Sequence, residues 1–244
     1  TISGTAAARS LLVNQSTDGT YAGTFTEGGS RPISLVKAGS AILTLSGVAT
    51  YTGATTVSNG TLRVNGSTSA SSAVTVAGGA LGGTGIIGGT VTVNSGGSLT
   101  AGTASIGTLT INNSVTLQSG STNVMRINKS GVTLTADKIA GTGSLALNGT
   151  LSVTTTGDPL AHGDTFTLFA KGSYSGFFVS SNLPSLTSPL LWDISRLTNN
   201  GTIRVYNPNT VSTPLFSPAT GGYASPQSVT LSSDAGATVY FTTN

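Results

Sequence analysis

Hydrophobic residues along this chain of 244 residues alternate with Thr and Ser at a period of two, in short runs separated by Gly, Ser and Asn. The segment 35–66 shows the pattern most clearly, with strand candidates at 42–45, 55–57 and 62–64 and no helical periodicity between them. After this segment the pattern continues as apolar-Thr-apolar triplets, at 74–76, 91–93, 109–111 and 115–117. The pattern therefore predicts an all-β chain built from many short strands.

The strand candidates recur at nearly constant spacing. Leu62 follows Leu43, Val91 follows Val74 and Leu109 follows Val91 at almost the same interval. Three short strands and their turns need about 18 to 20 positions, which is this interval, so each period is interpreted as one coil of a β-solenoid. The apolar residues of each triplet are expected to point inward and stack, while the central Thr faces solvent.

Glycine and asparagine residues mark the expected corners between strands. The glycine pairs are predicted to supply the positive φ that tight corners need; they lie at 78–79, 82–83, 88–89 and 96–97. Four asparagines near corners are candidates for hydrogen bonds to neighbouring coils: Asn59, Asn94, Asn112 and Asn148.

The segment 35–66 also carries a recognisable order of short motifs: Leu43 to Gly47, Tyr51-Thr52-Gly53, Thr55-Thr56-Val57 and Asn59 to Gly66. This order resembles the passenger-associated repeat of bacterial autotransporters, also called the autotransporter-associated β-strand repeat. Ala49 departs from the repeat, which usually has Asn before Thr-Tyr-Thr-Gly. The resemblance implies a right-handed parallel β-helix that is exported across a bacterial envelope and acts as a stalk, not as a catalyst.

Changes in composition divide the chain into four predicted parts. Residues 1–123 are β-helix repeats, 124–206 continue the β-helix and cap it, and 207–214 form a linker. Residues 215–244 resemble the start of the immunoglobulin-like C-terminal module of chitobiase, of which roughly 70 residues are needed for a complete β-sandwich. Large aromatic residues of the capping region are expected to close the end of the core: Phe166, Phe169, Phe177, Phe178 and Trp192.

Composition and charge limit the partners of the chain. Only 7% of residues are charged, 37% are hydrophobic and the net charge is +3, with Lys and Arg scattered singly. No basic stripe follows a phosphate backbone, so no nucleic-acid partner is expected. No apolar run approaches the roughly 18 residues of a membrane helix, so the chain is not expected to span a membrane. Since the repeat implies export, we expect an extracellular or bacterial cell-surface location, with any signal peptide removed or outside this sequence.

The acidic residues are candidates for glycoside hydrolysis or polysaccharide elimination, which need paired carboxylates or a base with cationic support. None of them lies one coil away from another in the regular part of the chain, and several neighbour Gly or Pro, where Asp commonly forms turns. The seven acids are Asp18, Glu27, Asp137, Asp158, Asp164, Asp193 and Asp234. No catalytic residue is therefore assigned, and the chain is predicted not to be an enzyme.

Two further patterns resemble cofactor or metal sites. His162 is the only histidine and lies between Asp158 and Asp164, which is interpreted as a surface turn rather than a metal site. The segment 83–88 has the GxGxxG spelling of a dinucleotide loop but precedes a strand candidate where a helix is required, and it lacks the Asp of a calcium-binding repeat. No cofactor and no metal ligand are predicted.

The leading hypothesis is a non-enzymatic structural segment: a stalk, spacer or fibre-forming unit of an autotransporter-like surface protein. Its expected partners are copies of itself, head to tail, or neighbouring modules of the same polypeptide. The alternative is a surface adhesin or carbohydrate-binding module, suggested by the chitobiase-like segment and by three tyrosines expected to be exposed, Tyr21, Tyr51 and Tyr174. A polysaccharide lyase or hydrolase is the third possibility.

Overall fold

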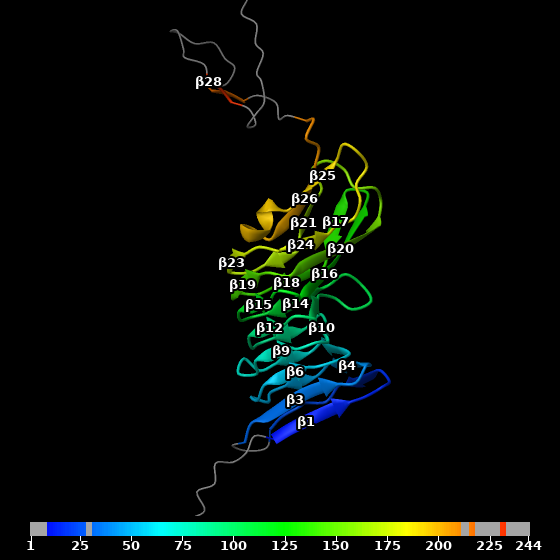
Figure 1. Ribbon diagram of the computed structural model, residues 1–244, viewed down its shortest axis with the longest axis vertical. Helices are drawn as coiled ribbons and strands as arrows, with labels where there is room; N and C mark the ends of the chain where they lie inside the picture. The colour runs from blue at the N-terminus through cyan, green and yellow to red at the C-terminus, as the bar shows by residue number, and fades with distance from the viewer. Residues whose placement is uncertain (1–8, 28–30, 211–214, 218–229, 233–244) are drawn as a thin grey trace, which may run out of the picture.

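Three parallel sheets run along the molecule, and successive coils of the chain add strands to them in turn. The computed structural model describes residues 9–27, 31–210, 215–217 and 230–232. In Figure 1 the coils stack along the long axis, from β1 at one end to the capping strands at the other. The architecture is a parallel β-helix, as the sequence predicted.

Each sheet is a series of strands in which every strand is hydrogen-bonded to the next. The first sheet contains, in spatial order, β1 (Arg9–Asn14), β3 (Ile33–Ala38), β6 (Thr55–Val57), β9 (Val74–Val76), β12 (Val91–Val93), β15 (Val115–Leu117), β19 (Ser144–Leu147) and β23 (Ser173–Gly176). The second contains β2 (Gly19–Tyr21), β4 (Ile42–Leu45), β7 (Thr61–Val64), β10 (Ala80–Gly82), β13 (Ser98–Thr100), β16 (Thr122–Ser130), β20 (Thr150–Gly157) and β24 (Ser180–Asn182). The third contains β22 (Phe169–Ala170), β18 (Lys138–Ala140), β14 (Thr108–Ile111), β11 (Ile86–Ile87), β8 (Ser67–Thr68) and β5 (Val48–Ala49).

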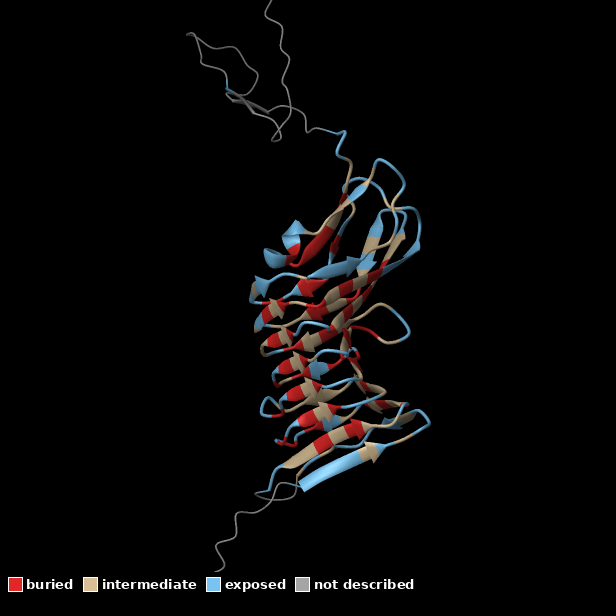
Figure 2. Cartoon of the chain, in the orientation of Figure 1, coloured by how far each residue is buried: buried red, intermediate tan, exposed pale blue. Residues whose placement is uncertain are grey.

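Equivalent side chains of successive coils stack in columns inside the β-helix. In the second sheet, Leu43 pairs with Leu62, which in turn pairs with Leu81. All three are buried, and Figure 2 shows buried positions alternating with less buried ones along the strands. The prediction that the apolar residues of each triplet point inward is confirmed at β9, β12 and β15, whose central Thr is half-buried.

The coils are less regular in length than the triplet spacing predicted. Val74 pairs with Val91, which confirms the coil predicted between these two residues, but Val91 pairs with Val115 and not with Leu109. The triplet 109–111 is not the next coil of the same sheet, as the spacing predicted, because it forms β14 of the third sheet. Periodicity alone cannot separate these cases, since strands of all three sheets share one apolar-Thr-apolar pattern.

The coil after β15 is longer than the first coils because it carries a hairpin. Val115 pairs with Leu145 of β19. Between these two residues, β16 runs on to Ser130 and the chain turns back as β17 (Thr133–Ala136), which pairs with β16 in antiparallel orientation. This hairpin extends the second sheet beyond the regular coil.

An antiparallel sheet and one turn of helix cover the end of the core. The sheet has the order β21 (Thr165–Thr167), β26 (Thr202–Tyr206), β25 (Leu191–Asp193), and the 3₁₀ helix η1 is Ser195–Thr198. Phe166 and Phe169 are fully buried, and Phe178 and Trp192 pack partly buried against the core. The prediction fails for Phe177, which is 70% exposed because it lies in the turn between β23 and β24 and points away from the core.

Most glycines of the four predicted pairs are required for close packing, not for backbone conformation. Of the eight glycines in the four pairs, only Gly83 and Gly96 have a positive φ, at 125° and 79°. At Gly89 an added Cβ would overlap the carbonyl oxygen of Ser72 in the preceding coil, as it would overlap that of Gly47 at another corner residue, Gly66. The predicted role is therefore wrong for most of these positions: they lack side chains because adjacent coils touch there.

The predicted immunoglobulin-like module at 215–244 lies mostly outside the described residues. In its described part, β27 (Leu215–Ser217) pairs with β28 (Thr230–Ser232) in antiparallel orientation. The chitobiase-like identity of this segment stays a prediction, as do the boundaries between the four parts.

Candidate functional site

The acidic side chains, which are the first candidates for chemistry, join neighbouring segments of the fold. Near the first coil, Asp18 accepts a hydrogen bond from the backbone N–H of Ile42, 2.8 Å away. Glu27 accepts from the N–H groups of Ile33 and Thr52 and from the Thr52 hydroxyl. The hydrogen bonds from Thr52 hold the pKa of Glu27 below its usual range. Both carboxylates thus connect the first coil to the second.

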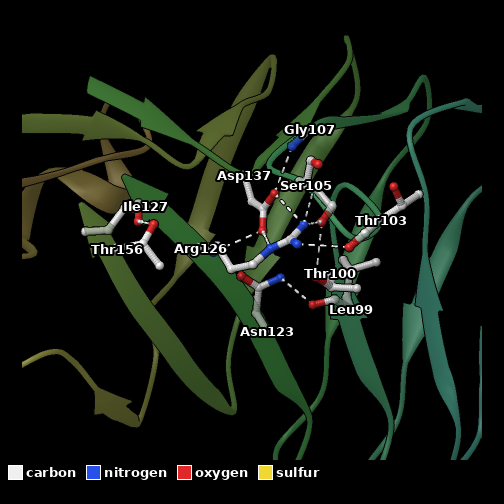
Figure 3. Close-up of polar contacts among 11 residues, drawn as sticks. Leu99, Thr100, Thr103, Ser105, Gly107, Asn123, Arg126, Ile127, Asp137 and Thr156 are labelled. Atoms are coloured by element: carbon white, nitrogen blue, oxygen red, sulfur yellow. Dashed lines mark hydrogen bonds and ion pairs between the residues drawn. The ribbon is translucent and has the colours of Figure 1, made fainter. Parts of the chain in front are cut away.

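Arg126 and Asp137 form an ion pair whose carboxylate side chain is fully buried (Figure 3). Asp137 is fully buried between β17 and β18 and accepts from the backbone N–H groups of Arg126 and Gly107, at 3.0 and 2.9 Å. Arg126 also donates to the carbonyl oxygens of Thr103 and Ser105, at 2.9 and 2.7 Å. The network fixes the base of the β16–β17 hairpin and the 101–107 loop to each other.

The segment from Asp158 to Asp164 is a turn, and its polar groups have structural partners. Asp164 pairs with Lys129 at 2.8 Å, and Asp158 accepts from the N–H of Gly131 at 2.7 Å. Nδ1 of His162 accepts from the N–H of Asn207 at 2.9 Å. The histidine therefore holds the chain that leaves β26, which agrees with its interpretation as a turn residue.

In the capping sheet, Asp193 organises the start of η1. Burial raises the pKa of Asp193, but hydrogen bonds from the hydroxyl and N–H of Ser195, with the charges of Arg204 and Arg196, leave it below its ordinary value. Every described acid therefore contacts a backbone N–H, a hydroxyl or a cation of its own chain. Asp234 lies outside the described residues.

The glycine-rich segment 83–88 lies between two strands. It follows β10 directly and contains β11, whose Ile86 pairs with Thr110 and Ser67. A pyrophosphate site of this spelling needs the N-terminus of a helix at the same place. The structure has a strand there, so the segment forms a corner of the solenoid.

Two buried lysines were not predicted from the sequence, and Lys37 is the first. It lies in an inward column with Val57 and Val76, is fully buried, and donates to the carbonyl oxygens of Ala38, Gly39 and Asn59. Burial lowers the pKa of Lys37. The alternation of β3 was the available signal, because Lys37 follows Leu35 by two residues and so shares its face.

Lys171 is the second buried lysine, and it lies at the corner between the third and first sheets. Its Nζ donates to the carbonyl oxygens of Ile111 and Asn113, which belong to an earlier coil. Burial lowers the pKa of Lys171 to about 8. No periodicity surrounds Lys171 in the sequence, so this position was not predictable.

A buried hydroxyl cluster occupies the same corner in earlier coils. The Tyr51 hydroxyl is 2.5 Å from Oγ1 of Thr55, which is 3.1 Å from Oγ of Ser72, and Ser72 donates to the carbonyl of Gly53. Burial is the main cause of a raised pKa of Tyr51. The prediction that Tyr51 is exposed is wrong, because its hydroxyl is satisfied inside the core.

The other two tyrosines of the adhesin hypothesis differ from each other. Tyr21 is 45% exposed, as expected. Tyr174 is only partly buried against the core, and its hydroxyl donates to the carbonyl of Phe169. A row of exposed tyrosines is therefore not formed.

The predicted asparagine contacts between coils were assigned to the wrong residues in two cases. Oδ1 of Asn59 and of Asn148 accepts from the N–H of the glycine that follows each of them. Asn65 does bridge two coils, since its Oδ1 accepts from the N–H of Thr84 at 3.2 Å.

Metal-ion clusters and membrane-spanning helices were sought in the part of the chain that the structure describes. Within it, no three His, Cys, Asp or Glu side chains are grouped so that they could hold a metal ion. No helix among the same residues has the length and hydropathy needed to cross a bilayer.

Comparison with known proteins identifies one segment of the chain. No curated protein matches the sequence. The family model of the passenger-associated-transport repeat matches residues 35–64, which run from within β3 to the end of β7 and include the leucine pair 43 and 62. The match agrees with the resemblance seen in the sequence and indicates an autotransporter passenger, and hence a secreted or surface protein. Residues 35–64 are thus a passenger-associated-transport repeat, folded as consecutive coils of a parallel β-helix.

Proposed function

We propose that the chain is a non-enzymatic structural segment, a stalk or spacer, of an extracellular autotransporter-like protein. The observation that carries the proposal is an unbroken inward column in the first sheet, where the paired residues are Val57, Val76, Val93 and Leu117. Each coil is hydrogen-bonded to the next along three sheets, so bending would strain many bonds together.

The polar residues support the same role. Carboxylates, lysines and hydroxyls that elsewhere perform chemistry are engaged in joining coils, as at Asp18, Lys37 and Lys171. Scarce charges also leave few surface contacts that depend on salt, because exposed ion pairs contribute little. A spacer outside the cell benefits from this insensitivity.

The spacer proposal is tested by removing one coil. Because Val74 pairs with Val91, deletion of residues 74–90 removes one register-matched coil. The variant is expected to fold and to shorten the distance between spin labels attached at positions 12 and 177 by about 4.8 Å, the spacing of adjacent strands. A deletion of residues 74–82, which removes half a coil, is the control and should lose the cooperative unfolding transition. Unchanged length after the full-coil deletion would contradict the proposal.

Absence of enzymatic activity needs its own experiment. The full chain is incubated with pectin, alginate and glucans, and reducing ends or unsaturated products are measured. We expect no release of reducing ends or unsaturated products. Asp158 accepts a hydrogen bond from the N–H of Gly131, and Asp164 pairs with Lys129, so both carboxylates have structural partners. Activity that disappears in Asp158→Ala or Asp164→Ala would establish an enzyme instead.

Head-to-tail self-association is the second part of the proposal. Among the described strands, β1 is the edge of the first sheet and carries Leu12, 60% exposed, while β23 is the opposite edge of the same parallel sheet. Edges of this kind are able to pair with each other in a repeating contact. Sedimentation is expected to show oligomers whose size increases with protein concentration, and Leu12→Lys should reduce their amount. A monomer at every concentration would contradict self-association.

A further inference from the structure

A groove of about 390 Å³ lies beside the hairpin that interrupts the regular coils. Its lining comes from β14 and the turn before it, from β17 and β18, and from the capping strand β21. The volume is in the range of small-ligand sites. The groove is a product of the departure from regularity, since β17 has no counterpart in the other described coils.

The walls of this groove are held in place by the Arg126–Asp137 network. Asp137 separates Ala136 of β17 from Lys138 of β18, and its carboxylate is fixed by Arg126 and by the N–H of Gly107. The N–H of Lys138 in turn donates to the carbonyl of Gly107 at 2.9 Å. The end of β17 and the start of β18, which line the groove, are therefore fixed before any ligand binds. This lowers the entropic cost of binding.

Lys138 is the only charged residue among those that line the groove. In the described part of the chain its Nζ has no hydrogen bond or ion pair, whereas the nearby carboxylates Asp137 and Asp164 are paired with Arg126 and Lys129. The groove therefore presents one uncompensated positive charge, which favours an anionic group.

Hydroxyl groups and apolar side chains surround this charge. Thr108, Thr135 and Thr167 line the groove from three different strands, and their hydroxyls have no partner within the described residues. Ile106 and Leu134, both half-buried, supply apolar surface beside them. Hydroxyl groups that donate and accept, next to apolar surface, match the polar edges and C–H faces of a sugar ring.

We propose that this groove, called the Lys138 groove, binds a carboxylate-bearing oligosaccharide, with the ammonium of Lys138 on the carboxylate and the threonine hydroxyls on the ring hydroxyls. This inference adds a binding site to the stalk, and it does not depend on the spacer proposal. The coils are the same whether or not a ligand occupies the groove. Failure of binding and failure of the spacer experiment are consequently separate results.

The proposal is tested by calorimetric titration of the full chain with oligogalacturonides and with their methyl esters, which lack the negative charge. We expect binding of the acids and at least about tenfold weaker binding of the esters, as for a lost hydrogen bond to a charged group. Lys138→Met should lower the affinity for the acids by a similar factor. A double variant with Thr135→Val and Thr167→Val should bind both the acids and the esters more weakly.

Arg63→Met is the matched control, because Arg63 lies on the outer side of β7, away from the groove, and the substitution removes the same charge. It should leave the affinity unchanged, and circular dichroism should show that all variants fold. The proposal is overturned if the acids do not bind, if acids and esters bind equally, or if Arg63→Met weakens binding as much as Lys138→Met.

Discussion

The guanidinium of Arg126 meets the carboxylate of Asp137 side-on across the base of the β16–β17 hairpin. Nε is 2.7 Å from Oδ2 and Nη2 is 3.0 Å from Oδ1. Asp137 is fully buried, while the Arg126 side chain is 27% exposed. A buried carboxylate is tolerated only with such partners, so the hairpin depends on this geometry.

We predict that Arg126→Met destabilises the chain by about 3–5 kcal/mol, because it leaves the charge of Asp137 buried without its partner. Denaturant unfolding measures the loss. Arg196→Met is the matched control: Arg196 is 45% exposed and its Nε lies 3.6 Å from Asp193, so its removal should cost less than about 1 kcal/mol. Equal losses in the two variants would show that the buried pair contributes no more than an exposed one.

The stability of the chain should rise with pH through Lys171. Its pKa is about 8 in the folded chain and near 10.5 when unfolded. Between these values the unfolded chain binds the proton and the folded chain does not, so the free energy of unfolding increases from about pH 8 upward. Below pH 8 both states are protonated and the penalty of burying the charge is constant.

Urea unfolding between pH 7 and 9.5 measures this effect, which should be on the order of 1 kcal/mol across the window once screening by solvent is allowed for. Lys171→Met removes the titrating group and should flatten the dependence in that range. The upper limit of the pH window excludes the titration of Tyr51. Because its pKa is raised, Tyr51 lowers the free energy of unfolding as pH rises above about 10. A slope that persists unchanged in the variant would assign it to other groups, such as Lys37.

Asn123 interrupts the leucine column of the second sheet. It pairs with Leu99 on one side and Leu151 on the other, is fully buried, and its Oδ1 has no hydrogen-bond partner in the described residues, although Nδ2 donates to the carbonyl of Leu99. Asn123→Leu should stabilise the chain by about 1–2 kcal/mol, because it removes an unsatisfied buried polar atom.

Thermal unfolding measures the change, and Leu99→Asn is the reciprocal control, expected to be destabilising at an equivalent position of the column. A loss of stability in Asn123→Leu would contradict the prediction. It would show that the hydrogen bond from the amide stabilises the fold by more than the unsatisfied oxygen destabilises it.

Gly66 and Gly96 separate the two reasons for a corner glycine. At Gly66 a Cβ would overlap the carbonyl of Gly47, so Gly66→Ala should cost about 3 kcal/mol or more by forcing adjacent coils apart. Gly96 has φ of 79° and open space around it, so Gly96→Ala should cost only about 1–2 kcal/mol for the left-handed conformation. Comparable losses, measured by denaturant unfolding, would refute the close-packing explanation.

The sequence alone indicated that the chain is a parallel β-helix, and it gave the register of the coils from Leu43 to Leu62 and from Val74 to Val91. Alternation of period two places Leu43 and Leu62 on the inner face, and the interval between them is the coil register found in the structure. The same alternation is also consistent with Lys37 and Asn123 on the inner face, since each lies two residues from a buried apolar residue of its strand. Such local information is sufficient because strand geometry fixes which side chains share a face.

Only the tertiary structure decided which coils are neighbours beyond Val91 and where the groove is formed. Sequence spacing does not distinguish strands of the three sheets, so the triplet 109–111 was assigned to the wrong one. The contact between Arg126 and Asp137 depends on the antiparallel pairing of β16 with β17, which brings these two residues together. The Lys138 groove combines residues from β14, β17, β18 and β21, which come together because coiling brings residues that are distant in the sequence into adjacent layers.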